Sequence, residues 1–280
     1  MYNQEKLLQL LNSGNEANIK LAFEMGKNLP EVNLDEILED YKELYQNLFG
    51  KDITTIQAEH IIALNQPEID AASSNITQIS PLIGKLANLE KLDLSETNLQ
   101  SLPESIGNLQ NLKKLDLGEL PIKSLPKSLG KLKRLEEIYL FENPITQLPE
   151  SIGAMTNLRL LAIEETKLSE LPQSIKNLKN LRILSLQGCN LSRLPDGISE
   201  LDNLIELDLW RNPLKAIPAE LGDFKNLQNL GLNHTQLTKV PSTLGNLKTL
   251  RTLDLWNNQL TTIPDSIGQL TNLEELFLTN

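Results

Sequence analysis

The sequence predicts an α/β solenoid in which short parallel strands alternate with short helical segments, preceded by a cap of α-helices. Two observations predict it. Leucines recur every 23 residues over most of the 280-residue chain, and a repeat of this length is too short to close a core alone. Over residues 1–65, by contrast, the apolar spacing has the helical period. Each repeat must therefore bury its apolar edge against the next, which produces an elongated stack.

One column of leucines defines the register of the repeats. No insertion interrupts its spacing, so the repeats should stack in phase. The column consists of Leu89, Leu112, Leu135, Leu158, Leu181, Leu204, Leu227, Leu250 and Leu273. A stack of this kind offers an extended surface and seldom encloses a catalytic pocket.

Each repeat is expected to contain a strand, a turn, a short helix and a return segment. Leu92 and Leu94 have the two-residue spacing of a strand that buries one face, so Lys91, Asp93 and Ser95 must face solvent. A proline follows in each repeat, and it favours the first turn of a helix because proline fixes φ and lacks the N–H donor. These prolines are Pro103, Pro126, Pro149, Pro172, Pro195, Pro218, Pro241 and Pro264.

The second half of the repeat follows the pattern LPxxIGxLxNL. One example comprises Leu148, Pro149, Ile152, Gly153, Met155, Asn157 and Leu158. In this pattern the chain resembles leucine-rich repeat proteins, namely plant intracellular Ras-group proteins, Ras-suppressor relatives, many bacterial cytosolic proteins and the arm that precedes Roco-type GTPase domains. The resemblance covers about Gln66 to Asn280. It implies a leucine-rich-repeat solenoid, a curved right-handed stack with a parallel concave sheet, and protein interaction through that sheet.

Three departures from the pattern predict local differences. Leu120 occupies a bend position that usually holds Asn, so the backbone there should be satisfied by another route or be looser, because a buried unpaired polar group costs roughly 1 to 3 kcal/mol. Lys176 and Ser199 interrupt a glycine column, and if its glycines have positive φ those two repeats must turn differently. Residues 66–88 keep the spacing in weaker form, as a terminal repeat does.

The chain divides into a helical N-terminal cap, residues 1–65, and a repeat array, residues 66–280, whose last repeat is incomplete. Asn33 and Glu36 resemble a capping box, and the apolar stripe that follows runs to Leu48 and stops at Gly50. Further helices are predicted at the ranges 4–11, 16–28 and 55–64. A cap would cover the apolar edge of the first repeat; the alternative is a separate helical recognition domain.

The composition disfavours several classes of function. No stretch approaches the length of a transmembrane span, and the N-terminal segment lacks the features of a secretory signal. Cys189 is the single cysteine, so no intrachain disulfide can form and a cytoplasmic location is expected. The formal net charge is -11, and residues 1–65 are acidic, which disfavours nucleic acid as a partner.

The chain contains no recognisable catalytic or cofactor motif. It has no Gly-rich phosphate loop, no paired cysteines and no HExxH. Ser185, His234 and Asp254 fall in different columns and repeats, with nothing to form an oxyanion site, and His60 lies on a cap helix. We therefore expect no enzyme activity, no cofactor and no metal.

Solvent-facing strand positions predict a partner-binding patch. Trp210 and Trp256 fall in one column two strands apart, hence about 10 Å from each other. Arg211 and His234 lie beside them, and Trp and Arg are frequent interface anchors. Further aromatic candidates on this face are Tyr139, Phe141 and Phe277. The alternative is that a solvated sheet merely tolerates isolated aromatics.

The other half of the same face is acidic. Four glutamates on successive repeats share one column, Glu96, Glu119, Glu142 and Glu165. Like charges on adjacent strands, roughly 5 Å apart, destabilise a sheet by up to about 1 kcal/mol each. The column predicts docking of a basic segment of a partner, or of a cation; the alternative is a solvated edge where the side chains splay apart.

The leading functional hypothesis is a non-catalytic protein-interaction module that binds its partner on the concave face. One alternative is a regulatory arm of a larger signalling enzyme of the GTPase or kinase type, because the sequence stops just after a strand. The open strand edge there also permits a homodimer. A glycan-binding surface built on the tryptophans is a third possibility.

Overall fold

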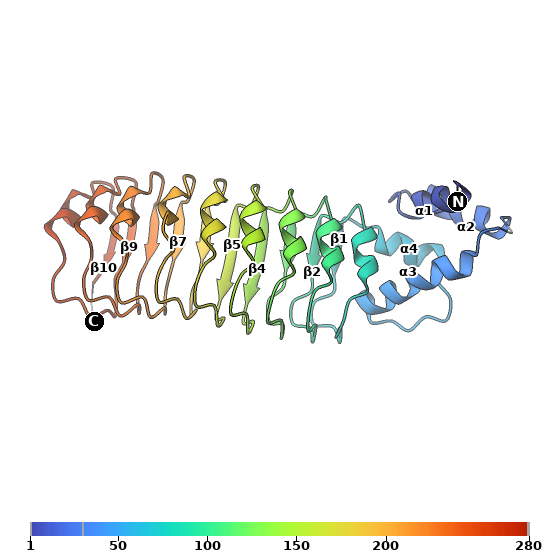
Figure 1. Cartoon of the computed structure of the whole chain (residues 1–280), viewed down its shortest axis with the longest axis horizontal. Coiled ribbons are helices and arrows are strands. Elements are labelled where there is room, and N and C mark those ends of the chain that lie inside the picture. Colours follow the sequence, from blue (N-terminus) through green and yellow to red (C-terminus); the bar gives the residue numbers. More distant parts are fainter. Residues whose placement is uncertain (1, 30, 279–280) are drawn as a thin grey trace.

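The computed structural model describes residues 2–29 and 31–278. It is an elongated row of stacked repeats with four α-helices at its N-terminal end (Figure 1). The strands form one ten-stranded sheet in which every strand is hydrogen-bonded to the next along the chain. All of the pairs are parallel. The predicted α/β solenoid with a helical N-terminal segment is confirmed.

The register of the sheet equals the sequence repeat. Leu92 pairs with Leu115, and Leu115 with Ile138, so each strand residue lies beside its counterpart 23 positions later. The strands are β1 (Glu68–Asp70), β2 (Lys91–Asp93), β3 (Lys114–Asp116), β4 (Glu137–Phe141), β5 (Leu160–Glu164), β6 (Ile183–Ser185), β7 (Glu206–Asp208), β8 (Asn229–Gly231), β9 (Thr252–Asp254) and β10 (Glu275–Phe277).

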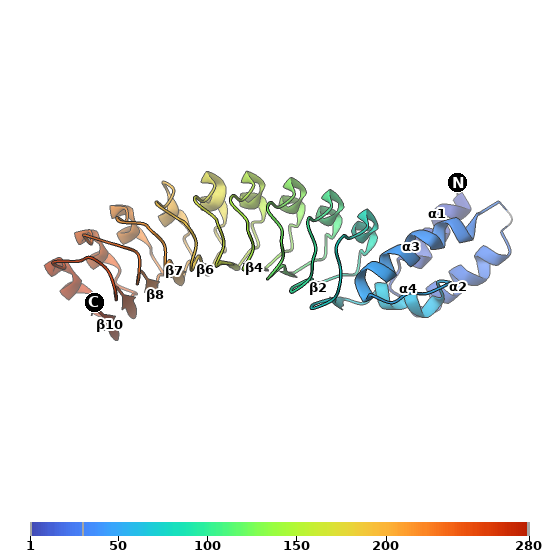
Figure 2. The same ribbon diagram turned by 90° about the horizontal axis from the view of Figure 1, so that it is seen from below.

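A short 3-10 helix follows each of the first nine strands. In seven of the nine it begins directly after the column proline, as at Pro103, whose extended φ of -71 and ψ of 150 make it the N-cap. The exceptions are the first, which begins at Pro81, and the sixth, which begins at Ile198 after Gly197. The helices are η1 (Pro81–Lys85), η2 (Glu104–Asn108), η3 (Lys127–Lys131), η4 (Glu150–Ala154), η5 (Gln173–Asn177), η6 (Ile198–Glu200), η7 (Ala219–Asp223), η8 (Ser242–Asn246) and η9 (Asp265–Gln269). Seen from below, with its long axis across the view, the array is curved, with the strands on the inner side and these helices on the outer side (Figure 2).

The glycine column serves close packing rather than an unusual backbone. We expected the repeats with Lys176 and Ser199 to turn differently if the column glycines had positive φ. That condition is not met, because the described glycines with positive φ are four others, at positions 14, 50, 188 and 197. A Cβ at Gly107 would instead lie 2.3 Å from the carbonyl oxygen of Ser128 in the next repeat. Adjacent 3-10 helices therefore touch through backbone, which only glycine permits.

The repeat that carries Lys176 accommodates it by a change in its neighbour. Where other repeats place Ser or Thr opposite the glycine, the residue facing Lys176 is Gly197, with φ 76, and a Cβ there would lie 3.2 Å from Cδ of Lys176. The following 3-10 helix, η6, is shortened to three residues. The convex side is therefore irregular at this repeat.

The N-terminal helices are α1 (Tyr2–Leu11), α2 (Glu16–Lys27), α3 (Leu34–Phe49) and α4 (Ala58–Leu64). As predicted, Oδ1 of Asn33 accepts the N–H of Glu36, 3.2 Å away, and Gly50 ends α3 in the left-handed conformation with φ 59. The fourth helix starts three residues later than the sequence predicted, at Ala58, after Gln57, whose N–H donates to Nδ1 of His60.

These helices pack against the first repeat. Asn88 donates to the carbonyl oxygen of Asn12 and to Oδ1 of Asn65, at 3.3 Å each. The backbone N–H of Ser80 donates to Oδ1 of Asn47, 3.0 Å away. One continuous hydrophobic core runs from the helices into the repeats. The first repeat thus buries its apolar edge, which its weak sequence alone would leave open.

In three of the repeats an asparagine holds the inside of the bend that follows the strand, namely Asn143, Asn212 and Asn258. Nδ2 of Asn258 donates to the carbonyl oxygens of Leu232 and Leu255, and its Oδ1 accepts from Thr235 and from the N–H of Leu237. Asn212 makes a similar set of bonds: its Nδ2 donates to the carbonyl oxygens of Leu186 and Leu209, and its Oδ1 accepts the N–H of Leu191. Such side chains tie consecutive repeats together through backbone groups that would otherwise be buried without partners.

The expectation for Leu120 is met by the next repeat. Nδ2 of Asn143 donates to the carbonyl oxygens of Leu117 and Leu120, at 3.0 and 2.9 Å, so this backbone is satisfied from outside its own repeat. The buried Oδ1 of Asn143, however, has no hydrogen-bond partner. Leu120 has no hydroxyl and Pro121 has no N–H, so this bend contains fewer donors than the others.

Candidate protein-binding surface on the concave face

The strand column that begins with Asp93 has a structural task that the sequence analysis missed. Oδ1 of Asp93 accepts the N–H of Ser95, and Asp208 and Asp254 accept from Trp210 and Trp256 in the same way, at 2.9 Å each. An aspartate that captures the N–H two residues later forms a turn and ends the strand. The sequence did contain a signal for this turn, because an aspartate recurs two positions before Ser95, Trp210 and Trp256.

Five strands lack this aspartate, and two adjacent ones among them are longer. Ser185, Gly231 and Phe277 also replace it, in strands of three residues, so its absence alone does not lengthen a strand. Tyr139 and Ala162 occupy its position in β4 and β5, and these strands have five residues, whereas the other eight in the described sheet have three. Phe141 and Glu164 consequently belong to the sheet and pair with each other. The middle of the concave face is therefore more regular than its ends.

The column after the tryptophans has a left-handed backbone in every repeat from the first to the ninth. The glutamates Glu96, Glu119, Glu142 and Glu165 have φ between 50 and 56, and Arg211, His234 and Asn257 have φ between 51 and 55. Positive φ is uncommon for residues other than glycine and turns the chain sharply out of the strand. The bend thus projects the glutamates and the Arg211–His234 pair from the same edge of the sheet.

The tryptophan patch forms one stacked cluster, defined here as Trp210, Arg211, His234 and Trp256. The His234 ring lies between the two indoles, with centroids 6.2 Å from Trp210 and 4.7 Å from Trp256, both edge-to-face. The Arg211 guanidinium lies 5.2 Å from the centroid of Trp210. Asn257 holds the imidazole through a 2.8 Å contact between its Nδ2 and Nδ1 of His234. Trp256 is 42% exposed, so this ordered apolar surface is open to solvent.

A second aromatic pair lies on the longer strands. The rings of Tyr139 and Phe141 meet edge-on with centroids 6.2 Å apart. The Phe141 ring covers Gly118, where a Cβ would come within 2.1 Å of it. The Lys114 ammonium lies 4.7 Å from the Tyr139 centroid. Burial, with help from Glu137, raises the pKa of Tyr139 to about 12, so its hydroxyl stays protonated and donates to Oε2 of Glu137, 3.0 Å away.

Phe277 lies apart from both clusters, on β10. It is 46% exposed and has no aromatic neighbour among the described residues. The structure therefore brings six of the seven non-acidic candidate residues into two separate groups and leaves the seventh alone.

The glutamate column is not uniform. Arg211 binds Glu165, with Nη1 3.0 Å from Oε1, and the contact passes over Gly188, whose missing Cβ leaves the room. Glu96 accepts a hydrogen bond from Oγ of Ser73 at 2.7 Å. Glu119 and Glu142 have no ion pair among the described residues. The column and the tryptophan patch are thus joined at Glu165, while the two central carboxylates point to solvent without a counter-charge.

Carboxylates deeper on the face are perturbed by burial. Burial raises the pKa of Asp208, despite hydrogen bonds from Trp210 and Gln187, and Glu206 adds to the rise. Burial also raises the pKa of Asp116, helped by Asp93. These groups would gain from a positive charge placed on the concave face.

Nothing in the described part of the chain brings three His, Cys, Asp or Glu side chains together as metal ligands. Cys189 is buried, with Sγ 3.2 Å from Oγ1 of Thr166, and burial raises its pKa. None of the described helices combines the length and apolar composition needed to cross a membrane.

Sequence comparison finds one family. The family model described as "Leucine-rich repeat region" matches three overlapping parts of the chain, residues 70–158, 138–233 and 219–280. Among curated proteins, no sequence matches the chain.

Solved structures share the architecture. A leucine-rich repeat protein of Leptospira interrogans is 30% identical over 88% of this chain and 75% of its own, with a TM-score of 0.50. The leucine-rich repeat domain of the type III effector XopL is 25% identical to this chain. The match covers 94% of this chain and 95% of that domain, with a TM-score of 0.69. The leucine-rich repeat ectodomain of the Arabidopsis thaliana receptor kinase GASSHO1/SCHENGEN3, in complex with CASPARIAN STRIP INTEGRITY FACTOR 2, is 29% identical. The match covers 77% of this chain and 30% of the ectodomain, with a TM-score of 0.59.

Proposed function

The chain belongs to the leucine-rich repeat family, and on this premise we propose that it is a non-catalytic module that binds a partner protein on its concave sheet. The LPxxIGxLxNL subtype and a cytoplasmic location are part of the proposal. The observation that carries it is the tryptophan patch, because an exposed, ordered cluster of Trp, His and Arg has the composition of an interface anchor.

Ordering of the patch supports binding over chance exposure. Isolated surface aromatics need no explanation, but here His234 is held by Asn257 and Arg211 by Glu165. Side chains that are fixed before binding lose less conformational entropy when a partner arrives. The GASSHO1/SCHENGEN3 ectodomain binds its ligand through the same fold class, which supports a protein or peptide as the partner here.

The acidic column supports a basic segment in that partner. Glu119 and Glu142 are exposed on adjacent repeats, in the left-handed column and without a counter-ion among the described residues. A Lys or Arg from a partner would relieve their mutual repulsion and orient the partner relative to the tryptophan patch. The alternative ligand for this column is a cation instead of a basic segment of a partner.

The proposal is tested by affinity capture from the native cell extract. Wild type is compared with the double variant Trp210→Ala/Trp256→Ala, and with Leu21→Ala, which removes a side chain that is 49% exposed on α2, away from the sheet. We expect a captured protein that is lost only with the tryptophan variant. Capture of the same proteins by all three would contradict binding at the patch, and a glycan array probed in parallel tests a sugar ligand.

The acidic column is tested by charge reversal once that partner is purified. Glu119→Lys/Glu142→Lys should weaken binding about tenfold at low ionic strength and remove most of its salt dependence. The matched control, Glu5→Lys/Glu59→Lys, changes the net charge equally on the helical segment. Unchanged affinity in the first variant, or equal losses in both, would rule out docking at the column.

We further infer that the helices of residues 1–65 act as a cap rather than as a recognition domain. The contacts of Asn47 with Ser80 and of Asn12 with Asn88 support this, because they seal the first repeat. Deleting residues 1–64 should leave an aggregating array with broad, non-cooperative unfolding. A soluble array that unfolds cooperatively would contradict the cap.

Self-association belongs to the same proposal. Leu276 and Phe277 on β10 are 39% and 46% exposed. Pairing of two copies there would bury both side chains. Sedimentation of wild type and Phe277→Ser should show a dimer only for wild type; a wild-type monomer at high concentration would contradict it.

A further inference from the structure

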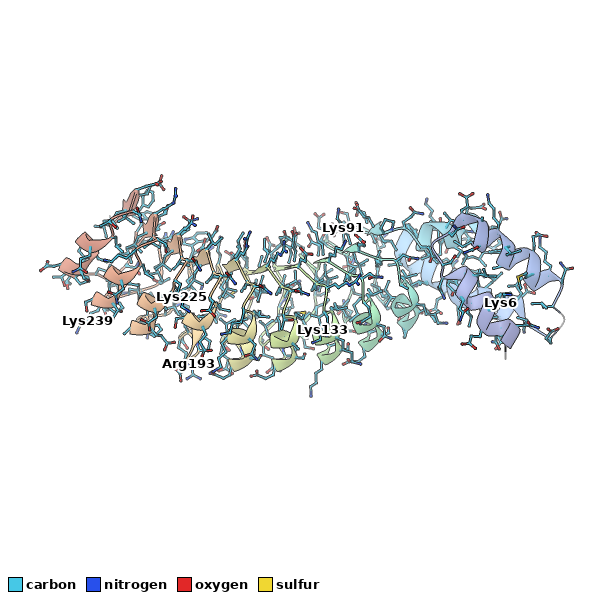
Figure 3. The ribbon with its side chains drawn as sticks, turned by 90° about the horizontal axis from the view of Figure 1, so that it is seen from above. Lys6, Lys91, Lys133, Arg193, Lys225 and Lys239 are labelled. Atoms are coloured by element: carbon cyan, nitrogen blue, oxygen red, sulfur yellow. The ribbon has the colours of Figure 1, made fainter. Side chains whose placement is uncertain are left out.

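The edge of the sheet where the strands begin carries a groove of opposite character to the glutamate column. Its volume is about 660 Å³. Figure 3 looks onto this edge, with Lys133 near the middle of the array. The residues that line the groove, called here the basic groove, are Lys113, Arg134, Glu136, Asn157, Arg159, Asn180, Arg182 and Asn203. They immediately precede the strands from β3 to β7.

The basic groove concentrates positive charge in a chain whose net charge is -11. Four of its residues are cations and one, Glu136, is an anion. Arg159 reaches Glu136 only at 3.5 Å, and Arg134 donates to the neutral side chain of Asn111. Arg182 is exposed and forms no ion pair or side-chain hydrogen bond with any described residue. Lys113 pairs with Glu90, with Nζ 2.7 Å from Oε2. Arg134 and Arg182 are therefore the groove cations that have no anionic partner among the described residues.

The positions of these cations are fixed by the sheet ladder. The N–H of Arg182 donates to the carbonyl oxygen of Arg159, 2.8 Å away, and Arg159 donates in the same way to Glu136. Adjacent parallel strands lie about 4.8 Å apart, so the backbones of Lys113 and Arg182, three repeats apart, are separated by roughly 15 Å. The charges form a row along the solenoid rather than a pocket around one point.

A ladder of asparagines supplies acceptors beside this row. Nδ2 of Asn157, Asn180 and Asn203 each donates to a backbone carbonyl oxygen of the preceding repeat, at 2.7 to 2.9 Å. No described donor reaches their Oδ1 atoms. Two repeats before Asn157, Oδ1 of Asn111 accepts from the guanidinium of Arg134, which shows that this atom is accessible to a donor.

We infer that the basic groove binds an extended acidic peptide segment of a partner protein. Arginines pair with carboxylates through two parallel hydrogen bonds, and the asparagine Oδ1 atoms can accept the N–H groups of an extended backbone. A row roughly 15 Å long matches several residues of such a segment and exceeds the reach of a single inorganic anion. This surface is independent of the concave face, although both lie on the same repeats.

The test uses the full chain and a fluorescein-labelled octaglutamate peptide, with binding followed by fluorescence anisotropy at low ionic strength. Arg159→Gln/Arg182→Gln should weaken binding about tenfold, because each exposed charge contact contributes less than about a factor of five. The matched control is Lys225→Gln/Arg251→Gln, which removes two cations outside the groove; these pair with Asp202 and Glu274. Circular dichroism confirms that both variants are folded.

Three results would overturn the inference. Wild type could fail to bind octaglutamate, or the control could lose as much affinity as the groove variant, which would indicate net charge alone. Inorganic phosphate could also compete at the same concentration as the peptide, which would indicate a small-anion site. Trp210→Ala/Trp256→Ala should bind octaglutamate normally, so that a failure here is distinguishable from a failure of the concave-face proposal.

Discussion

The first half of the concave face, over β2–β5, and the second half, over β7–β9, share one backbone but differ in chemistry. Both have the same parallel register and the same left-handed bend. The first half places carboxylates in the bend, whereas the second places Arg211, His234 and Asn257 there. The comparison teaches that the repeat determines where a side chain points, and that the variable positions determine what the surface can bind.

The two halves also differ inside the bend. Asn258 satisfies both its amide and its carbonyl oxygen, whereas Oδ1 of Asn143 is buried without a partner. The half that carries the tryptophan patch is therefore tied more completely between repeats. A rigid support under the anchor residues lowers the entropic cost of binding.

The largest expected effect is a loss of stability when the bend asparagine of either half is replaced by alanine. Asn258→Ala should destabilise the protein by about 3 kcal/mol, because it leaves several buried backbone groups without partners. Asn143→Ala should cost about 1 kcal/mol less, since its Oδ1 forms no bond to lose. Urea unfolding of both variants measures the difference. Equal losses would show that the bend of the first half is as well bonded as that of the second.

A smaller effect should appear as a pH dependence of the second half. Because burial raises the folded-state pKa of Asp208, the native state binds more protons than the unfolded state, and this group contributes more stability as the pH falls. Asp208→Asn should therefore be more stable than wild type at neutral pH. Its advantage should shrink as the pH approaches the ordinary aspartate range near about 4.

Thermal unfolding across this pH range measures the advantage. Asp265→Asn on η9 is the control, since that carboxyl lies outside the sheet. A constant difference between Asp208→Asn and wild type at all pH values would contradict the buried-carboxylate explanation.

The glutamate column should be a site of modest strain. Glu119 has φ 56, and Asn tolerates this region better than Glu. Glu119→Asn should stabilise the protein by about 0.5 to 1 kcal/mol through relief of backbone strain and of repulsion from Glu96 and Glu142. The reciprocal change, Asn257→Glu in the second half, should destabilise by a similar amount. Urea unfolding of the two variants should give changes in the free energy of unfolding of opposite sign. Changes of the same sign would contradict the strain explanation.

The smallest effect concerns the contact that joins the two halves. Arg211→Gln removes the ion pair with Glu165 and the contact with the Trp210 ring. Both partners of the pair are about half exposed, so the loss of stability should be about 0.5 kcal/mol. Tryptophan fluorescence should nevertheless change, because the indole loses its charged neighbour. An unchanged spectrum would show that Arg211 does not order the patch.

Much of the candidate surface could be predicted because strand parity is strict. Trp210 and Trp256 share a column, and the structure places His234 between their rings. The left-handed backbone at Glu119 could not be predicted, because glutamate has no preference for it. The sequence also left open why the glycine column exists. The structure shows that Gly107 is required by the carbonyl oxygen of Ser128 in the next repeat and not by its own φ.

The sequence by itself determined the repeat, the parallel register and the side of the sheet on which each residue lies, because these follow from leucine spacing and the alternation of a strand. Only the tertiary structure decided which residues of different repeats meet. The Glu165–Arg211 pair spans 46 positions, and the basic groove draws its cations from different columns. Such contacts depend on the small distance between stacked repeats and on the direction of each bend, which no local pattern in the chain encodes.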